Sequence, residues 1–137
     1  MSGSQILADE SLMKTRSEQP CVLLVDDYLD ARQMYTAYLE YSGFSVVQAT
    51  NGVEALREAL ESRPDIILMD LSLPVMDGWE ATRQLKADPR TAKIPVVALT
   101  GQSLRNPDGA KEVGCEAFLT KPCLPEDLVQ EIRRVLA

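Results

Sequence analysis

The sequence contains no histidine among its 137 residues. This absence excludes Ser-His and Cys-His catalysis, imidazole metal sites and a phosphohistidine carried by the chain itself. Any chemistry must therefore rely on carboxylates, hydroxyls, lysine amines and backbone amides.

Long hydrophobic runs are also missing, since no apolar stretch approaches the roughly 20 residues that a membrane span requires. The N-terminus lacks the basic region followed by an apolar run that is typical of a signal peptide. Basic residues are the minority, which gives a net charge of −7. Nucleic-acid phosphates and anionic lipids repel a chain with this charge. We therefore expect a cytoplasmic protein that binds neither nucleic acid nor membrane directly.

Cysteine is scarce, and the three thiols do not have the spacing of metal ligands. We expect Cys21, Cys115 and Cys123 to be reduced and partly buried. A chain of this length fits one domain and can bury enough surface to fold without a covalent staple.

The first 19 residues are polar and mixed, with only scattered apolar side chains. Chain ends that are not tied into a fold are usually disordered. We therefore predict a flexible leader over residues 1–19 and a single folded domain over residues 20–137.

Short apolar runs alternate with amphipathic segments from Cys21 onward. The runs predict strands near residues 22–25, 44–49, 66–69, 94–99 and 117–119. The segments predict helices that begin near residues 30, 51, 78, 108 and 125. This alternation favours an α/β fold in which helices cover both faces of a parallel sheet. Polar Ser45 and Gln48 place the second strand at an edge, which fits the order 2-1-3-4-5 of a doubly wound, five-stranded, flavodoxin-like sheet.

Local signals define the expected helix ends. Asp30 can cap the first helix, and Gly43 follows its last turn. Asn51 lies three residues before Glu54, which is the spacing of a capping box. Pro125 lies early in the final helix, where proline is tolerated.

Reactive side chains follow four of the five predicted strands. Asp26 and Asp27 end the first, Asp70 the third, Thr100 the fourth and Lys121 the fifth. In an open α/β sheet the ligand site lies outside the carboxyl ends of the strands. The fold would therefore gather three carboxylates, one hydroxyl and one ammonium into one crevice.

The predicted carboxylate cluster needs positive charge. Asp27 alone would more simply cap a helix, but three converging carboxylates repel one another by roughly 1 kcal/mol per pair at about 4 Å in water. Lys121 supplies one positive charge, and a divalent cation could supply the rest. Ligation by oxygen alone favours Mg²⁺, with Mn²⁺ as the alternative. A carboxylate beside a metal and an amine can attack phosphorus and form an acyl phosphate.

The motifs resemble those of a known family, the receiver domains of two-component response regulators, in particular the single-domain type of chemotaxis regulators. The resemblance covers about residues 20–137. Its motifs are Val25-Asp26-Asp27, Asp70 with Pro74 and Asp77-Gly78 behind it, Leu99-Thr100, and Lys121-Pro122.

This resemblance implies a (βα)5 receiver fold and a function for the acidic residues. Asp70 would be the phosphoacceptor, and Asp26, Asp27, Asp70 and the backbone carbonyl of Ser72 would bind Mg²⁺. The donor would be a histidine kinase or a histidine phosphotransfer protein. The absence of histidine agrees with a donor that comes from another chain.

The resemblance also implies roles for the residues around the phosphoryl group. Lys121 and the backbone amide of Gly101 would contact it, Thr100 would be the switch hydroxyl, and Phe118 the switch aromatic. Movement of Thr100 would vacate space that Phe118 can fill without stranding a hydroxyl group. A plain core role for Phe118 is the alternative. The Lys121–Pro122 peptide bond would be cis.

One stretch departs from the family pattern. Residues 106–109 read Asn-Pro-Asp-Gly where the fourth helix of the family begins, and Pro107 and Gly109 disfavour helix before about Asp108. The face made by this helix, the fifth strand and the last helix is the usual output surface. A downstream protein target, or a second copy in a dimer, would dock there.

Three functions remain open from the sequence. The first is a phosphoacceptor switch that catalyses only its own phosphorylation and dephosphorylation. The second is an Asp-nucleophile phosphatase, but Ser72 occupies the position where its acid would be needed. The third is an interaction module that acts without phosphorylation. No sequence follows the last helix, so we expect either a shuttle or regulator that works alone, or a piece of a larger protein.

Overall fold

The computed structural model describes residues 19–101 and 107–137. The predicted leader therefore lies almost wholly outside the described residues, as does Asn106.

Five parallel strands form one sheet, in the order β2-β1-β3-β4-β5 that the sequence predicts. The strands are β1 (Cys21–Val25), β2 (Ser45–Ala49), β3 (Ile66–Asp70), β4 (Val96–Thr100) and β5 (Ala117–Thr120). The polar second strand lies at one edge, as expected.

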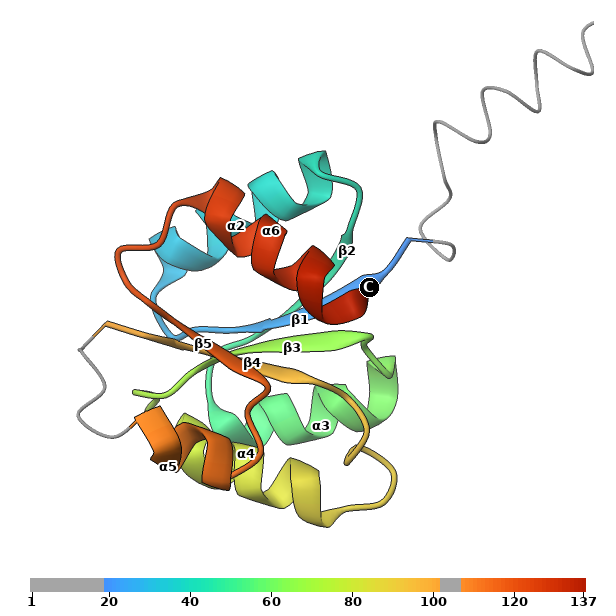
Figure 1. Ribbon diagram of the computed structural model, residues 1–137, viewed down its shortest axis with the longest axis vertical. Helices are drawn as coiled ribbons and strands as arrows, with labels where there is room; N and C mark the ends of the chain where they lie inside the picture. The colour runs from blue at the N-terminus through green and yellow to red at the C-terminus, as the bar shows by residue number, and fades with distance from the viewer. Residues whose placement is uncertain (1–18, 102–106) are drawn as a thin grey trace, which may run out of the picture.

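Helices cover both faces of the sheet, as Figure 1 shows. The helices are α2 (Leu29–Tyr41), α3 (Gly52–Ser62), α4 (Gly78–Ala87), α5 (Pro107–Glu112) and α6 (Pro125–Leu136). Helices α2 and α6 lie on one face, and α3, α4 and α5 lie on the other. Within the described residues, every helix falls short of the length and apolar character that a membrane crossing demands.

Two cores result because successive strand residues point to opposite faces. Leu23 and Ile67 pack among the side chains of α3 and α4, whereas Leu24 and Leu68 pack among those of α2 and α6. All four are completely buried. Burial on both sides explains why β1 and β3 are continuous apolar runs.

Helix α2 begins one residue earlier than expected, and the prediction that Asp30 caps it is wrong. Tyr28 is the N-cap residue, and its carbonyl accepts a hydrogen bond from the backbone amide of Arg32 at 3.0 Å. Its own amide is already bound to the Asp26 carboxylate at 2.9 Å, so the turn after β1 forms the start of the helix. Asp30 lies in the first turn, where a carboxylate still complements the helix dipole.

Three other element starts can be compared with their local signals. The Asn51 side chain accepts from the amide of Glu54 at 2.9 Å, as predicted, although Glu54 bonds back to Thr50. Helix α5 begins at Pro107, one residue before the expected start, because proline is tolerated in a first turn. Strand β4 begins two residues late, at Val96, since the preceding Pro95 has no amide hydrogen to donate.

The three cysteines are free thiols, as expected. Cys115 is buried, and burial raises the pKa of its thiol to about 11. The thiol is therefore protonated and unreactive at neutral pH.

Candidate functional site

The parallel strands bring the predicted residues together at their carboxyl ends. Asp26 and Asp27 follow β1, and Asp70 is the last residue of the neighbouring β3. Carboxylate oxygens from all three lie within 4.8 Å of one another. Asp26 and Asp70 are buried, at 0% and 5% exposure, whereas Asp27 is exposed. The crevice therefore has two buried carboxylates at its floor and one at its rim.

Lys121 reaches this cluster from the end of β5. Its ammonium Nζ lies 2.5 Å from Oδ2 of Asp26 and 3.3 Å from Oδ2 of Asp70. Burial lowers the pKa of Lys121, but the hydrogen bond to Asp26 and the charges of both carboxylates outweigh it and raise the pKa above its usual value. Three carboxylates against one ammonium leave two negative charges in the crevice.

Asp70 combines a buried position with strong hydrogen bonding. Burial raises the pKa of its carboxyl group, while the amide of Ser72, which donates to Oδ1 at 2.9 Å, and the charge of Lys121 lower it. The net effect is a raised pKa. One carboxylate oxygen is thus held by the backbone, and the other faces Lys121.

The residues at the ends of β4 and β5 are linked through the backbone. The amide of Lys121 donates to the carbonyl of Thr100 at 2.6 Å, and the peptide bond from Lys121 to Pro122 is cis, as the resemblance implied. Thr100 is buried at 3% exposure, and Gly101 beyond it has open space around its Cα.

Phe118 is half-buried against the core on the α3 and α4 face. It pairs across the sheet with Ala98, two residues before Thr100. Because residues two apart on a strand share a face, Thr100 and Phe118 lie on the same side of the sheet. This placement suits both a switch pair and a plain core role for Phe118.

The loop after Asp70 contains contacts that sequence reasoning missed. A Cβ on Gly78 would lie 2.1 Å from the backbone carbonyl oxygen of Asp70, so only glycine lets α4 begin there. The sequence showed the Asp77-Gly78 motif, but it did not show that the backbone of Asp70 leaves no room for a larger residue at position 78. The loop also holds Val75 at a φ of 66°.

The donor set of the crevice fits a hard divalent cation. Its ligand atoms are carboxylate oxygens, its charge is negative, and one member is solvent-accessible. Mg²⁺ prefers oxygen ligands and retains several waters, which the exposed side of such a site can supply.

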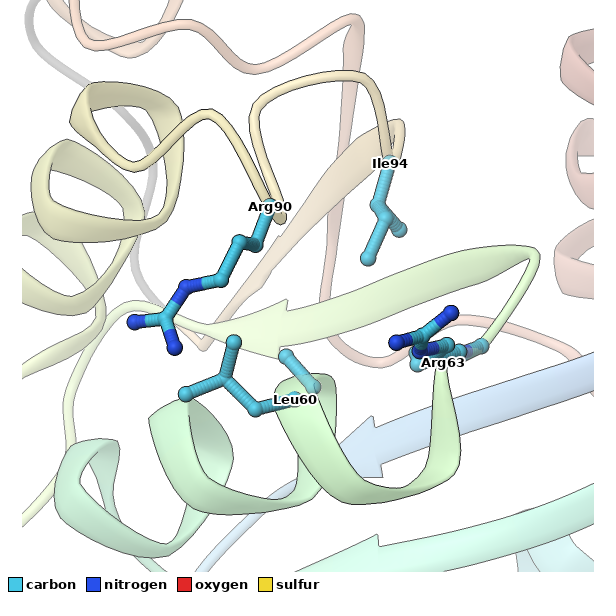
Figure 2. Close-up of a pocket in the computed structure, with 6 residues that line it drawn as sticks. Leu60, Arg63, Arg90 and Ile94 are labelled. Atoms are coloured by element: carbon cyan, nitrogen blue, oxygen red, sulfur yellow. The ribbon is translucent and has the colours of Figure 1, made fainter.

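A separate hollow lies at the amino ends of the strands, away from the acidic crevice. It has a volume of about 440 Å³ and lies between the end of α3 and the connection from α4 to β4. Figure 2 shows Arg63, Arg90, Leu60 and Ile94 around it. Arg90 is already paired with Asp88 at 2.8 Å. This hollow adjoins the amino ends of β3 and β4 and is distinct from the acidic crevice at their carboxyl ends.

Comparison with known proteins identifies the family. The family model described as the response regulator receiver domain matches residues 22–133. The chain therefore belongs to the response regulator receiver domains of two-component signalling.

Individual relatives resemble most of the chain. It is 35% identical over 116 residues to the polar-differentiation response regulator DivK of Brucella anthropi, covering 84% of this chain and 94% of that protein. It is 38% identical over 117 residues to the protein PilH of Pseudomonas aeruginosa, covering 85% and 97%.

Solved structures agree with this assignment. The chemotaxis protein CheY4 of Vibrio cholerae superposes with a TM-score of 0.82 at 34% identity, covering 86% of this chain and 99% of that one. The receiver domain of the sensor histidine kinase PA1611 of Pseudomonas aeruginosa has a TM-score of 0.80 at 32% identity, covering 86% and 98%. That structure holds a magnesium ion in its active-site cleft.

Proposed function

We propose that the chain is a phosphorylation switch in which Asp70 accepts a phosphoryl group from a histidine kinase or a histidine phosphotransfer protein. The observation that carries this proposal is the meeting of Asp26, Asp27 and Asp70 within 4.8 Å, with Lys121 bonded to two of them. The receiver unit is proposed to extend over residues 20–137.

Asp26, Asp27 and Asp70, with the backbone carbonyl of Ser72, would hold Mg²⁺, and the same donors suit Mn²⁺. A bound ion supplies positive charge that neutralises phosphoryl oxygens during transfer. The magnesium ion seen in the PA1611 receiver domain supports this assignment.

In the proposed reaction, a carboxylate oxygen of Asp70 forms a bond to the phosphorus atom. The bond from phosphorus to the donor nitrogen breaks, and its electron pair leaves with the donor imidazole. Lys121 is placed to hold one phosphoryl oxygen because its ammonium already lies 3.3 Å from Asp70. Thr100 and the amide of Gly101, at the end of the adjacent strand, would donate hydrogen bonds to others.

The switch is proposed to act through Thr100 and Phe118. Attraction of the Thr100 hydroxyl to the phosphoryl group would vacate space beside β4. Phe118 lies on the same face of the sheet and would turn inward to fill that space. A local change of charge would thereby alter the surface of α5, β5 and α6, where a downstream protein target would dock.

Mg²⁺-dependent labelling by acetyl phosphate tests the proposal. We expect intact-protein mass spectrometry to show one added phosphoryl group with Mg²⁺ and none with a chelator. Asp70→Asn should abolish labelling, because an amide is not a nucleophile for this reaction. The control is Asp77→Asn, which changes an acid in the same loop but keeps a good helix cap.

Full labelling of Asp70→Asn would place the phosphoryl group elsewhere and refute the proposal. A wild-type protein that neither binds Mg²⁺ nor becomes labelled would favour an interaction module that acts without phosphorylation. Steady turnover of phosphate esters would favour a phosphatase.

A further inference from the structure

Arg32 connects α2 to the turn that carries two of the acidic residues. From the first turns of α2, its guanidinium Nη1 donates to the backbone carbonyl of Asp26 at 2.8 Å. Its Nε donates to Oε1 of Gln48, on the edge strand β2, at 3.1 Å. The half-buried arginine thus joins three elements at the rim of the crevice.

The carbonyl that Arg32 binds belongs to the peptide bond between Asp26 and Asp27. The same turn is held by the amide of Asp26, which donates to Ala49 at 3.1 Å, and by the amide of Tyr28, which donates to the Asp26 carboxylate at 2.9 Å. These bonds fix the position of Asp26 directly. Arg32 donates to the carbonyl of the following peptide group, whose orientation sets the direction of Asp27.

Asp27 needs such support more than the other two carboxylates. Asp26 is bonded to Lys121 and Tyr28, and Asp70 to Lys121 and Ser72. Among the described residues, the Asp27 side chain has no hydrogen-bond or ion-pair partner, and it is exposed. Its place in the cluster is therefore set by the backbone.

We propose that Arg32, held by Gln48, is a positioning residue that orients the Asp26–Asp27 peptide so that the Asp27 carboxylate faces the metal site. This inference rests on the proposed function, because it assumes that the acidic crevice binds Mg²⁺. In this proposal the positively charged Arg32 favours the binding of Mg²⁺, although the two charges repel.

The charge of Arg32 and its orienting hydrogen bond affect Mg²⁺ affinity in opposite directions. A guanidinium near the crevice repels a divalent ion, so loss of its charge alone would tighten Mg²⁺ binding. Loss of the orienting bond would instead weaken binding, as happens when groups that orient metal ligands are removed. The direction of the change in affinity therefore separates positioning from simple charge.

The experiment measures Mg²⁺ affinity by calorimetric titration of the full chain and of Arg32→Met. We expect about tenfold weaker binding in the variant, at the lower end of the effect of removing a group that orients a metal ligand. The rate of labelling by acetyl phosphate should fall by a similar factor at low Mg²⁺ and recover when Mg²⁺ is saturating. A purely structural role would not produce this recovery.

Two further variants keep the test decisive. Gln48→Leu leaves the charge in place and removes only the contact that holds Arg32, so it should weaken Mg²⁺ binding by a smaller factor. Arg83→Met removes an exposed arginine on α4 that pairs with Glu80, and it should leave the affinity unchanged. If Arg32→Met does not fold, as judged by urea unfolding in chelator, Gln48→Leu carries the test.

Unchanged or tighter Mg²⁺ binding in a folded Arg32→Met, or unchanged binding in Gln48→Leu where Arg32→Met does not fold, would overturn the positioning role. A wild-type chain that binds no Mg²⁺ would instead refute the proposed function on which the role rests. The wild-type and variant titrations thus distinguish the two failures.

Discussion

Val75 lies in the loop between the proposed phosphoacceptor and α4, and its backbone conformation is unfavourable for valine. Its φ is 66°, in the left-handed region, and its side chain is 85% exposed. The loop is pinned on both sides, because the amide of Met76 donates to Pro74 at 2.7 Å and the amide of Gly52 donates to Met76 at 3.0 Å. A β-branched residue held there costs about 1–2 kcal/mol.

We expect Val75→Gly to raise the free energy of unfolding by about 0.5–1 kcal/mol. The relief of strain should exceed the extra entropy that glycine gains in the unfolded chain. Urea unfolding monitored by circular dichroism measures the change. The matched control is Val53→Gly, at an exposed helical position in α3, which should lower stability by a similar amount. A lower stability of Val75→Gly would contradict the strain argument.

At the scale of single residues, the sequence revealed the side chains that carry charge at strand ends. Asp26, Asp70 and Lys121 were predicted to meet because each follows an apolar run, and the sheet brings them together. Arg32 and Val75 gave no such signal. A bond to a backbone carbonyl and a positive φ depend on the three-dimensional path of the chain, which no residue spacing encodes.

Lys86, in the last turn of α4, ties that helix to the starts of two strands. Its ammonium donates to the carbonyls of Ala92 at 3.2 Å and Ile94 at 2.7 Å, and to Glu116 at 3.1 Å. The second oxygen of Glu116 accepts from the amide of Val96 at 2.6 Å. The side chain of Lys86 is only 18% exposed, so water replaces these bonds poorly.

We therefore expect Lys86→Met to lower the free energy of unfolding by about 1–3 kcal/mol, because backbone carbonyls and Glu116 lose their donor. Lys93→Met, at an exposed position near the start of β4, should change it by less than about 0.5 kcal/mol. Urea unfolding measures both. Labelling by acetyl phosphate should persist in Lys86→Met, since these contacts lie at the amino ends of the strands and Asp70 lies at the carboxyl end of β3. Equal stabilities of the two variants would contradict the importance of this network.

The elements themselves were predictable because their patterns are strong. Runs such as Val22–Val25 are typical of strands buried on both faces. The polar Ser45 and Gln48 of the second strand indicated its place at an edge, and hence the strand order. Boundaries were less predictable where a side chain binds the backbone of a turn. Helix α2 begins at Leu29 because the amide of Tyr28 donates to the Asp26 carboxylate, and this turn makes Tyr28 the N-cap residue.

At the scale of the whole molecule, unbalanced charge links metal binding to stability. The chain has a net charge of −7, and three of its acids converge in one crevice with a single lysine. A cation that binds only the folded state stabilises it by mass action.

We expect Mg²⁺ at a hundred times its dissociation constant to raise the free energy of unfolding by about 2.7 kcal/mol. Asp27→Asn should lose most of this increment. In chelator it should be at least as stable as wild type, because one repulsion of roughly 1 kcal/mol is removed. Urea unfolding with and without Mg²⁺ measures both effects. Asp30→Asn, outside the cluster, should keep the increment, and its retention by Asp27→Asn would exclude Asp27 as a ligand.

The close approach of Gly78 to the backbone of Asp70 has an optical consequence. The next residue, Trp79, is the chain's only tryptophan, and it lies half-buried in the first turn of α4, packed against the core that contains Met69 of β3. Tryptophan fluorescence therefore reports on one place in the molecule, next to the strand that ends in Asp70. We therefore expect events in the crevice to change the intrinsic fluorescence, which can be measured without a dye and without any change to the sequence.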